Sequence, residues 1–431
     1  METTPWNGTG NRTVVVPGIN APSTVACLRS LGRRGIRTIV VSSEETTPAF
    51  RSRYCDESVL VPSPHDDLVA YKEALRSLAM RPDVCTIVPV REPDVYVLSR
   101  YRDEFREHVA TPWPQFDTLA RVQDRVRLFE AAESAGVSVP ETTLFTALPD
   151  ADREWIVKPR YSILGDAYLD RYTPETCVAP PSTRYLEFES ALASAPAVGS
   201  GTGAAPSAES DGGTVSTTTD LTERLRSEMH HVPVVQQYIP TTDEYGFFAL
   251  YDRGEPVATF QHRQRRGWSY AGGPSAYRES TRIPALENAG RALLDHLDWH
   301  GLAMVEFLRD ESTGEFKLME VNPRFWSSLP FTVQTGADFP YYYWLLASGQ
   351  RSRIDHDYRS DIGGHLLRGE LLYLHSVLVD DVPLVEKPDV TDALADVVRS
   401  LVDQPRFDYL SRDDPLPFVR DLVNTIGEIR D

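Results

Sequence analysis

The stretch that decides the fold reads Leu318-Met319-Glu320-Val321-Asn322-Pro323-Arg324. Apolar runs at 301–307 and 315–318 flank a short polar turn just before it, which predicts two strands joined by a loop. Alternate residues of a strand point to the same face, so Glu320 and Asn322 present oxygen ligands side by side, and Glu306 can face them. Such a set suits Mg²⁺, which completes its shell with waters and substrate phosphates. Arg324 adds a planar cationic fork for phosphate or carboxylate.

Composition limits the classes of protein to which the chain can belong. Its 431 residues suffice for two or three domains, and 41% hydrophobic residues indicate a globular protein. A net charge of −19 argues against nucleic-acid or anionic membrane partners. The four cysteines lack metal or CxxC spacing, which is typical of buried thiols in a reducing compartment. With no apolar leader and no transmembrane-length run, we expect a cytoplasmic protein.

The choice of cation carries a further prediction. Only four of the 44 basic residues are lysines, at positions 72, 158, 317 and 387. An acidic, lysine-poor surface suits high intracellular salt, which screens charge repulsion, and this favours a halophilic source. The alternative is a mildly acidic protein from a mesophile with a GC-rich genome.

The first 110 residues alternate strands and helices. Strands are predicted at 13–16, 36–41, 58–61 and 85–90, with helices at 24–34 and 66–80. This βαβ pattern implies a parallel sheet. The loop after the first strand contains Gly18 but no GxGxxG, so a dinucleotide site is not indicated. The loop is either a plain turn, with a helix cap at Ser23, or an anion site at the helix N-terminus.

Later segments supply further landmarks. Helices are predicted at 117–136 and 284–299, strands at 155–158, 232–240, 245–251 and 256–262, and an arginine- and glycine-rich loop at 263–273. The stretch 195–219 is rich in Ser, Gly, Thr, Ala and Pro and reads as a flexible surface insertion.

Together these segments resemble the ATP-grasp superfamily, close to carboxylate–amine ligases and the large subunit of carbamoyl phosphate synthase. The resemblance rests on the acid at 306 followed by Glu-x-Asn-Pro-Arg at 320–324, on Asp124-Arg125 where the family has Asp-Lys, and on a strand ending in Lys158. It spans roughly residues 12–350.

The resemblance implies both α/β and α+β architecture. A parallel-sheet pre-ATP-grasp domain would occupy residues 12–115, and a two-lobed ATP-grasp domain 116–350, with its small lobe at about 150–238. Residues 351–431 would form an appended segment.

The resemblance also implies ATP and Mg²⁺ (or Mn²⁺) as cofactors. The metal ligands would be Glu306, Glu320 and Asn322. Lys158 and Arg125, or else Arg127, would face the triphosphate, Gln236, Gln237, Tyr238 and Ile239 the adenine, and Glu244 the ribose. Arg324, Lys158 and Arg265 are the expected catalytic residues, with Arg263 and Arg278 as further candidates on the acceptor side. The family's glycine-rich lid after the lysine is reduced here to a single glycine, Gly165.

The expected reaction is the ATP- and Mg²⁺-dependent joining of a small-molecule carboxylate to an amine through an acyl phosphate, releasing ADP and phosphate. A homodimer is one option for its assembly. One alternative is a bicarbonate- or carbamoyl-type carboxylase; the chain lacks a Met-Lys-Met biotin motif, which weakens only self-biotinylation. The other is a non-catalytic ATP-binding module, which the thin glycine loop favours and the complete metal set opposes.

Overall fold

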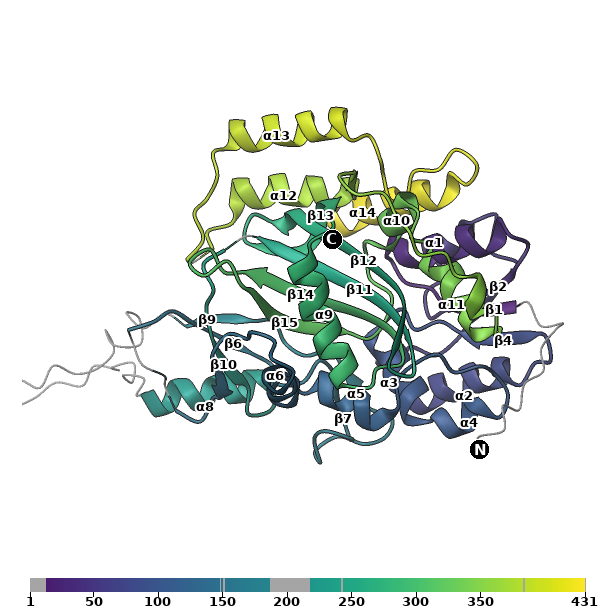
Figure 1. The fold of residues 1–431 in the computed structure, drawn as a ribbon, viewed down its shortest axis with the longest axis horizontal. Coiled ribbons are helices and arrows are strands. Elements are labelled where there is room, and N and C mark those ends of the chain that lie inside the picture. Colours follow the sequence, from purple (N-terminus) through teal and green to yellow (C-terminus); the bar gives the residue numbers. More distant parts are fainter. Residues whose placement is uncertain are drawn as a thin grey trace, which may run out of the picture.

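The computed structural model describes residues 13–147, 149, 152–186, 218–241, 243–382 and 384–430. Nearly all of the predicted insertion at 195–219 lies outside these residues. Two four-stranded sheets and one six-stranded sheet organise the chain, and helices of the C-terminal segment line one edge of the largest sheet (Figure 1).

The N-terminal domain is built on the predicted parallel sheet. Its strands are β1 (Thr13–Pro17), β2 (Arg37–Ser42), β3 (Glu57–Leu60) and β4 (Val84–Ile87), in the order β3-β2-β1-β4. Its helices are α1 (Pro22–Gly32), α2 (Leu68–Ala79), α3 (Glu92–Arg100) and α4 (Arg102–Arg106). The predicted cap at Ser23 is wrong, because α1 begins two residues earlier than expected, after Ala21, and has no side-chain cap.

The small lobe follows two linking helices, α5 (Phe116–Gln123) and α6 (Arg125–Ser134). Its sheet has the order β5-β10-β6-β9, formed by β5 (Thr142–Leu144), β10 (Val234–Gln237), β6 (Trp155–Lys158) and β9 (Arg184–Leu186). Helix α8 (Thr218–Met229) covers one face, where Leu225 and Met229 pack on Trp155, Val157 and Val235. That packing leaves the alternate residues of β6 and β10, including Lys158, on the opposite face.

The large lobe carries the predicted metal strands as neighbours in an antiparallel sheet. Its order is β15-β14-β11-β12-β13-β16, formed by β11 (Glu244–Asp252), β12 (Glu255–Ser269), β13 (Gly272–Ser280), β14 (Gly301–Arg309), β15 (Phe316–Asn322) and β16 (Gly363–His365). Helix α9 (Pro284–His296) crosses one face. The predicted loop at 263–273 is wrong, since β12 continues through it to Ser269 and turns back as β13.

The C-terminal segment adds one short strand to this sheet and packs a helix on it. Strand β16 pairs with β13, and α12 (Leu367–Val379) packs on β12 and β13 under α13 (Val390–Asp403). Helix α14 (Leu416–Arg430) reaches the N-terminal domain. Just before it, Asp414 accepts a hydrogen bond of 2.9 Å from Nε of buried Arg29.

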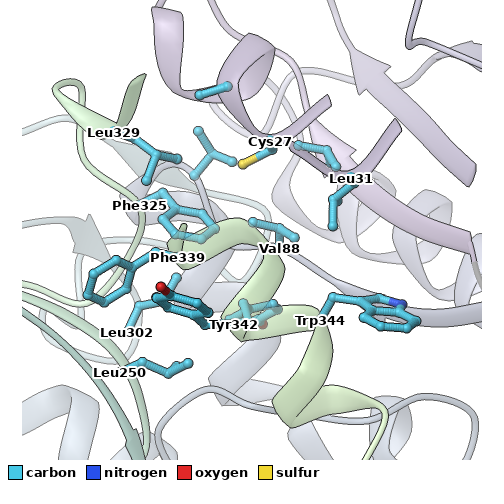
Figure 2. Close-up of a cluster of buried hydrophobic side chains, with 14 of the residues drawn as sticks. Cys27, Leu31, Val88, Leu250, Leu302, Phe325, Leu329, Phe339, Tyr342 and Trp344 are labelled. Atoms are coloured by element: carbon cyan, nitrogen blue, oxygen red, sulfur yellow. The ribbon is translucent and has the colours of Figure 1, made fainter. Parts of the chain in front are cut away.

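One core joins the N-terminal domain to the large lobe. Figure 2 shows Cys27 and Leu31 of α1 beside Val88 and a group of large-lobe side chains. That group includes Leu250, Leu302, Phe325, Leu329, Phe339, Tyr342 and Trp344, the last four lying on or near α10 (Leu329–Thr335) and α11 (Phe339–Ala347). Cys27, Cys85 and Cys177 are buried thiols as predicted, and Cys55 is half-buried.

Among the helices that the structure describes, none combines the length and the apolar character needed to cross a membrane.

Candidate nucleotide and metal site

We call strands β14 and β15 the metal hairpin, after the role predicted for their side chains, and its two carboxylates lie directly opposite each other. Glu306 of β14 is the register partner of Glu320 of β15. The Asn322 amide donates 2.9 Å to Oε1 of Glu306 and 3.2 Å to Oε1 of Glu320, so it links both carboxylates. Burial, and next the charges of Glu320 and Glu244, raise the pKa of Glu306 to about 8. Burial acts in the same sense on Glu320, but Arg125 and Lys158 outweigh it and its pKa is lowered.

This arrangement fits a hard divalent cation. Among the described residues, no group of three or more His, Cys, Asp or Glu side chains could hold a metal ion. The candidate ligands are instead two carboxylates, of Glu306 and Glu320, and one amide, of Asn322. This small set leaves coordination positions open for phosphate oxygens and water. Burial is the first cause of the raised pKa of Glu306 and the neighbouring carboxylates are the second, and a bound cation would favour the charged carboxylate against both.

Two cationic residues, Lys158 and Arg125, lie beside the carboxylates of the hairpin. Lys158 ends β6, and burial, with Arg125 second, lowers its pKa to about 8 against the opposing charges of Glu320, Glu306 and Glu244. Arg125 begins α6 and donates 2.9 Å to Oε2 of Glu320 and 2.8 Å to the carbonyl oxygen of Pro159. The alternative residue, Arg127, has a side chain 58% exposed and lies near Asp124, outside this cluster.

Arg324 connects the metal hairpin with the N-terminal domain. Its guanidinium donates 2.8 Å to Oδ1 of Asn322 and 3.0 Å to Oε1 of Glu92. Glu92 also accepts 3.0 Å from Gln123, and burial raises its pKa despite the opposing charge of Arg324. The sequence analysis missed Glu92. Glu92 could have been found from its place just after a buried parallel strand, because ligand sites in parallel sheets gather at the carboxyl ends of the strands.

Glu244 joins the cluster from β11. Burial raises its pKa to about 7, opposed by Lys158. Gln264 of β12, its register partner, donates a side-chain hydrogen bond to it, so the two side chains share a face of the sheet.

Arg265, predicted as a catalytic residue, lies away from this cluster. Arg265 donates 2.7 Å to Glu279, the register partner of Arg263, on the face opposite to Gln264. The further candidate Arg263 pairs with Asp243, and Arg278 is fully buried against Asp408. None of the three arginines therefore joins the cluster around Glu244.

The predicted adenine segment is divided between the two faces of the small lobe. Gln236 shares with Lys158 the face turned away from the lobe core; its Nε2 donates 2.9 Å to Thr142, while its Oε1 is buried without a hydrogen-bond partner. Gln237 lies on the core face with Trp155, and its backbone NH donates to the carbonyl of Glu141.

The other two residues of that segment are anchored within the protein. The backbone NH of Tyr238 donates 2.9 Å to the carbonyl of Glu154, and its hydroxyl lies 3.5 Å from the carbonyl oxygen of Leu384. Ile239 is buried. Contacts between these residues and an adenine stay a prediction.

After Lys158 the chain forms a packed segment that we call the strap. It occupies the place where the resemblance to the ATP-grasp superfamily implies a glycine-rich lid. The strap, residues 161–178, contains the two-stranded pairing of β7 (Leu164–Gly165) with β8 (Cys177–Val178). Its side chains Ile163 and Cys177 belong to the core of the N-terminal domain. Nη2 of Arg100 in α3 donates 2.7 Å to Oδ2 of Asp166. The strap therefore ties the small lobe to the N-terminal domain.

Replacing Arg100 by alanine should loosen the strap. A charge-assisted hydrogen bond in a half-buried setting contributes about 1.5–3 kcal/mol, so amide exchange in residues 164–178 should rise at least severalfold. Hydrogen-exchange mass spectrometry would measure it. Arg106→Ala, on an exposed arginine of neighbouring α4, is the matched control and should leave this protection unchanged. Equal protection in Arg100→Ala and wild type would show that the ion pair does not hold the strap.

Comparison with known proteins supports the resemblance. Residues 257–354 match the family model for the carbamoyl-phosphate synthase L chain, ATP binding domain. The L-amino acid ligase from Bacillus licheniformis aligns at 14% identity with a TM-score of 0.55, over 83% of this chain and 79% of that one. The chain has the ATP-grasp fold.

Other ATP-grasp structures align equally well. The N5-carboxyaminoimidazole synthetase from Staphylococcus aureus, complexed with ADP, gives 14% identity and a TM-score of 0.55, over 84% of this chain and 83% of that one. The biotin carboxylase domain dimer of 2-oxoglutarate carboxylase from Hydrogenobacter thermophilus, in complex with MgADP and bicarbonate, aligns at 14% identity with a TM-score of 0.56. The alignment covers 83% of this chain and 74% of that one. The search of curated proteins found no match.

Proposed function

We propose that this protein is an ATP- and Mg²⁺-dependent carboxylate–amine ligase. It would activate a small-molecule carboxylate as an acyl phosphate, transfer the acyl group to an amine, and release ADP and phosphate. The observation that carries the proposal is the meeting of Glu306, Glu320 and Asn322 with the cations Lys158, Arg125 and Arg324. Phosphoryl transfer depends mainly on positioning and on neutralising negative charge, and this cluster supplies both.

Each residue has a distinct role in this proposal. Glu306, Glu320 and Asn322 would hold Mg²⁺ or Mn²⁺ after the Asn322 amide, whose nitrogen donates to both carboxylates, turns its oxygen toward them. The bound ion would neutralise and orient the phosphates. Lys158 and Arg125 would bind phosphate oxygens. Arg324 would hold the carboxylate or the transferred phosphoryl group, and Glu92 would keep its guanidinium in place.

The nucleoside end would lie against Gln236 and Glu244. The orphaned Oε1 of Gln236 is a hydrogen-bond acceptor on the face of Lys158, and an exocyclic amino group such as that of adenine would satisfy it. Glu244 would accept hydrogen bonds from the ribose hydroxyls.

A bicarbonate-dependent carboxylase is the second candidate. Arg324 offers two donors to any planar carboxylate-like anion, and one structural neighbour, the 2-oxoglutarate carboxylase domain, carries bicarbonate. The non-catalytic module is a weaker candidate, because the chain retains the complete set of charged residues and places them together.

The proposed function is tested by Mg²⁺-dependent release of ADP and phosphate. Pools of amino acids and small carboxylic acids would be supplied with and without bicarbonate, in molar KCl, because we also infer that the acidic, lysine-poor chain is adapted to salt. Release that needs both a carboxylate and an amine supports the ligase. Release that needs bicarbonate supports the carboxylase, and ATP binding without release in any pool supports the module.

ATP affinity should fall as pH rises above about 8. The pKa of Lys158 is lowered to about 8, so the ammonium is present below that pH and is lost above it. If the ammonium is needed to bind a phosphate, the affinity for ATP should fall by up to about tenfold for each pH unit above 8. Calorimetric titration of ATP in EDTA between pH 7 and 9.5 would measure the fall.

Lys158→Met should bind ATP weakly, and its ATP affinity should fall less steeply with rising pH. The fall that remains would come from Glu306, whose pKa is also about 8 and which becomes negatively charged above it. Lys72→Met, which removes a lysine paired with Glu104 in the N-terminal domain, is the control and should follow wild type. An unchanged slope in Lys158→Met would mean that Lys158 does not contact the nucleotide.

A further inference from the structure

Exposed aliphatic side chains gather on the three C-terminal helices. Before Leu371 the described residues include four exposed large hydrophobics, namely Leu60, Met80, Leu144 and Val232. Helices α12, α13 and α14 together carry eleven: Leu371, Leu378, Val379, Val390, Leu394, Val398, Val402, Leu416, Val419, Leu422 and Val423. We call these eleven residues the aliphatic surface. Such a concentration on an otherwise acidic protein marks an interaction site.

The centre of the aliphatic surface is a groove. It has a volume of about 400 Å³ and lies between the three helices, with Leu371 and Leu374 of α12, Leu394 and Val398 of α13 and Leu422 of α14 among its lining. Four charged residues in the lining, Arg368, Glu370, Asp408 and Asp421, all have partners within the chain. A partner would therefore meet an apolar groove in which these charges are already neutralised.

The size of the surface fits a protein partner. Eleven aliphatic side chains, each about half exposed, present on the order of 800 Å², which is the area that each partner buries in a typical stable dimer. This is more than a small ligand in the groove would cover. A net charge of −19 disfavours an anionic membrane as the occupant.

We infer that the aliphatic surface is the docking site for a second copy of this chain. A two-fold contact buries the same patch on both partners, so one apolar patch suffices for both. Its margins are complementary: Asp392 and Asp403 on α13 are exposed acids, while Arg412 and Arg420 are cations before and on α14. A two-fold arrangement that sets α13 against α14 of the partner brings these acids close to these cations, which offsets the general repulsion between two acidic chains.

The test is the mass of the protein in solution, which does not depend on the proposed function. Sedimentation equilibrium in molar KCl should give twice the chain mass of 48.4 kDa for the wild type. Val398→Glu and Leu371→Glu each place a charge at the groove and should give the single-chain mass. Because both side chains are exposed, both variants should keep the wild-type circular dichroism spectrum and ATP affinity.

Leu60→Glu, at an equally exposed leucine of β3, is the matched control and should remain a dimer. A wild type that stays at the single-chain mass up to high micromolar concentration would overturn the inference, whether or not it then binds vesicles or another protein. A dimer that persists in both folded groove variants would overturn it too, since the contact would then lie elsewhere.

Discussion

Replacing Glu320 by alanine should abolish turnover and leave the fold intact. The change removes one of the two carboxylates that face the metal position, so the Mg²⁺–phosphate charge would be held by Glu306 and Asn322 alone. Loss of one such transition-state contact typically costs roughly 10²–10³-fold in rate, and loss of the metal costs more. Mg²⁺-dependent ADP release measures it. Removing a like charge should also relieve Glu306, whose pKa its neighbour raises, so the melting temperature should not fall.

Glu311→Ala is the matched control. Glu311 is an exposed acid in the turn between the same two strands, and its loss should leave turnover at the wild-type rate. Wild-type turnover in Glu320→Ala would contradict the metal assignment. A melting temperature several degrees lower in that variant would instead show that Glu320 serves the fold through Arg125.

Replacing Arg278 by methionine should destabilise the protein by about 3–5 kcal/mol. Arg278 and Asp408 form an ion pair with side chains only 0% and 2% exposed, and the change leaves the carboxylate buried without its partner. Proteins of ordinary stability hold roughly 5–15 kcal/mol in total, so this loss is a large share. Urea unfolding in constant KCl would measure it.

The double variant Arg278→Met/Asp408→Leu should recover most of the loss, because replacing both members of a buried pair by apolar groups is often neutral. Arg37→Met, which breaks the exposed pair with Glu57, is the control and should cost less than about 1 kcal/mol. A single variant at Arg278 as stable as wild type would show that water reaches Asp408.

The metal hairpin could be predicted because its information is local. Glu306, Glu320 and Asn322 lie on adjacent strands joined by a short turn, and strand alternation alone fixes their common face. The lysine at the end of β6 could be placed in the same way. Both predictions needed only the order of residues within one or two strands.

Strand alternation separates Arg265 from the cluster. Gln264 reaches Glu244, so Arg263 and Arg265, one position to either side, lie on the opposite face near Glu279. The pattern of residues predicted that the two arginines share a face, but it did not show which face of β12 meets Glu244.

Glu92 and β16 could not be predicted because their positions depend on distant segments. Glu92 meets Arg324 only when the N-terminal domain packs on the large lobe, across more than half the chain. Strand β16 has three residues, two of them glycines, and no periodicity to reveal it. Its pairing with β13 is visible only in the assembled sheet.

The place of β16 at the edge of the central sheet has a consequence for biosynthesis. The ribosome delivers the metal hairpin well before it delivers residues 363–430, so the nascent chain holds most of its catalytic groups while β13 still has an open edge. Until then Arg29 and Arg278 lack their ion-pair partners, Asp414 and Asp408. Chains cut short by a stop codon or a stalled ribosome would therefore expose an unpaired strand edge and unpaired interior charges, features that chaperones and proteases recognise.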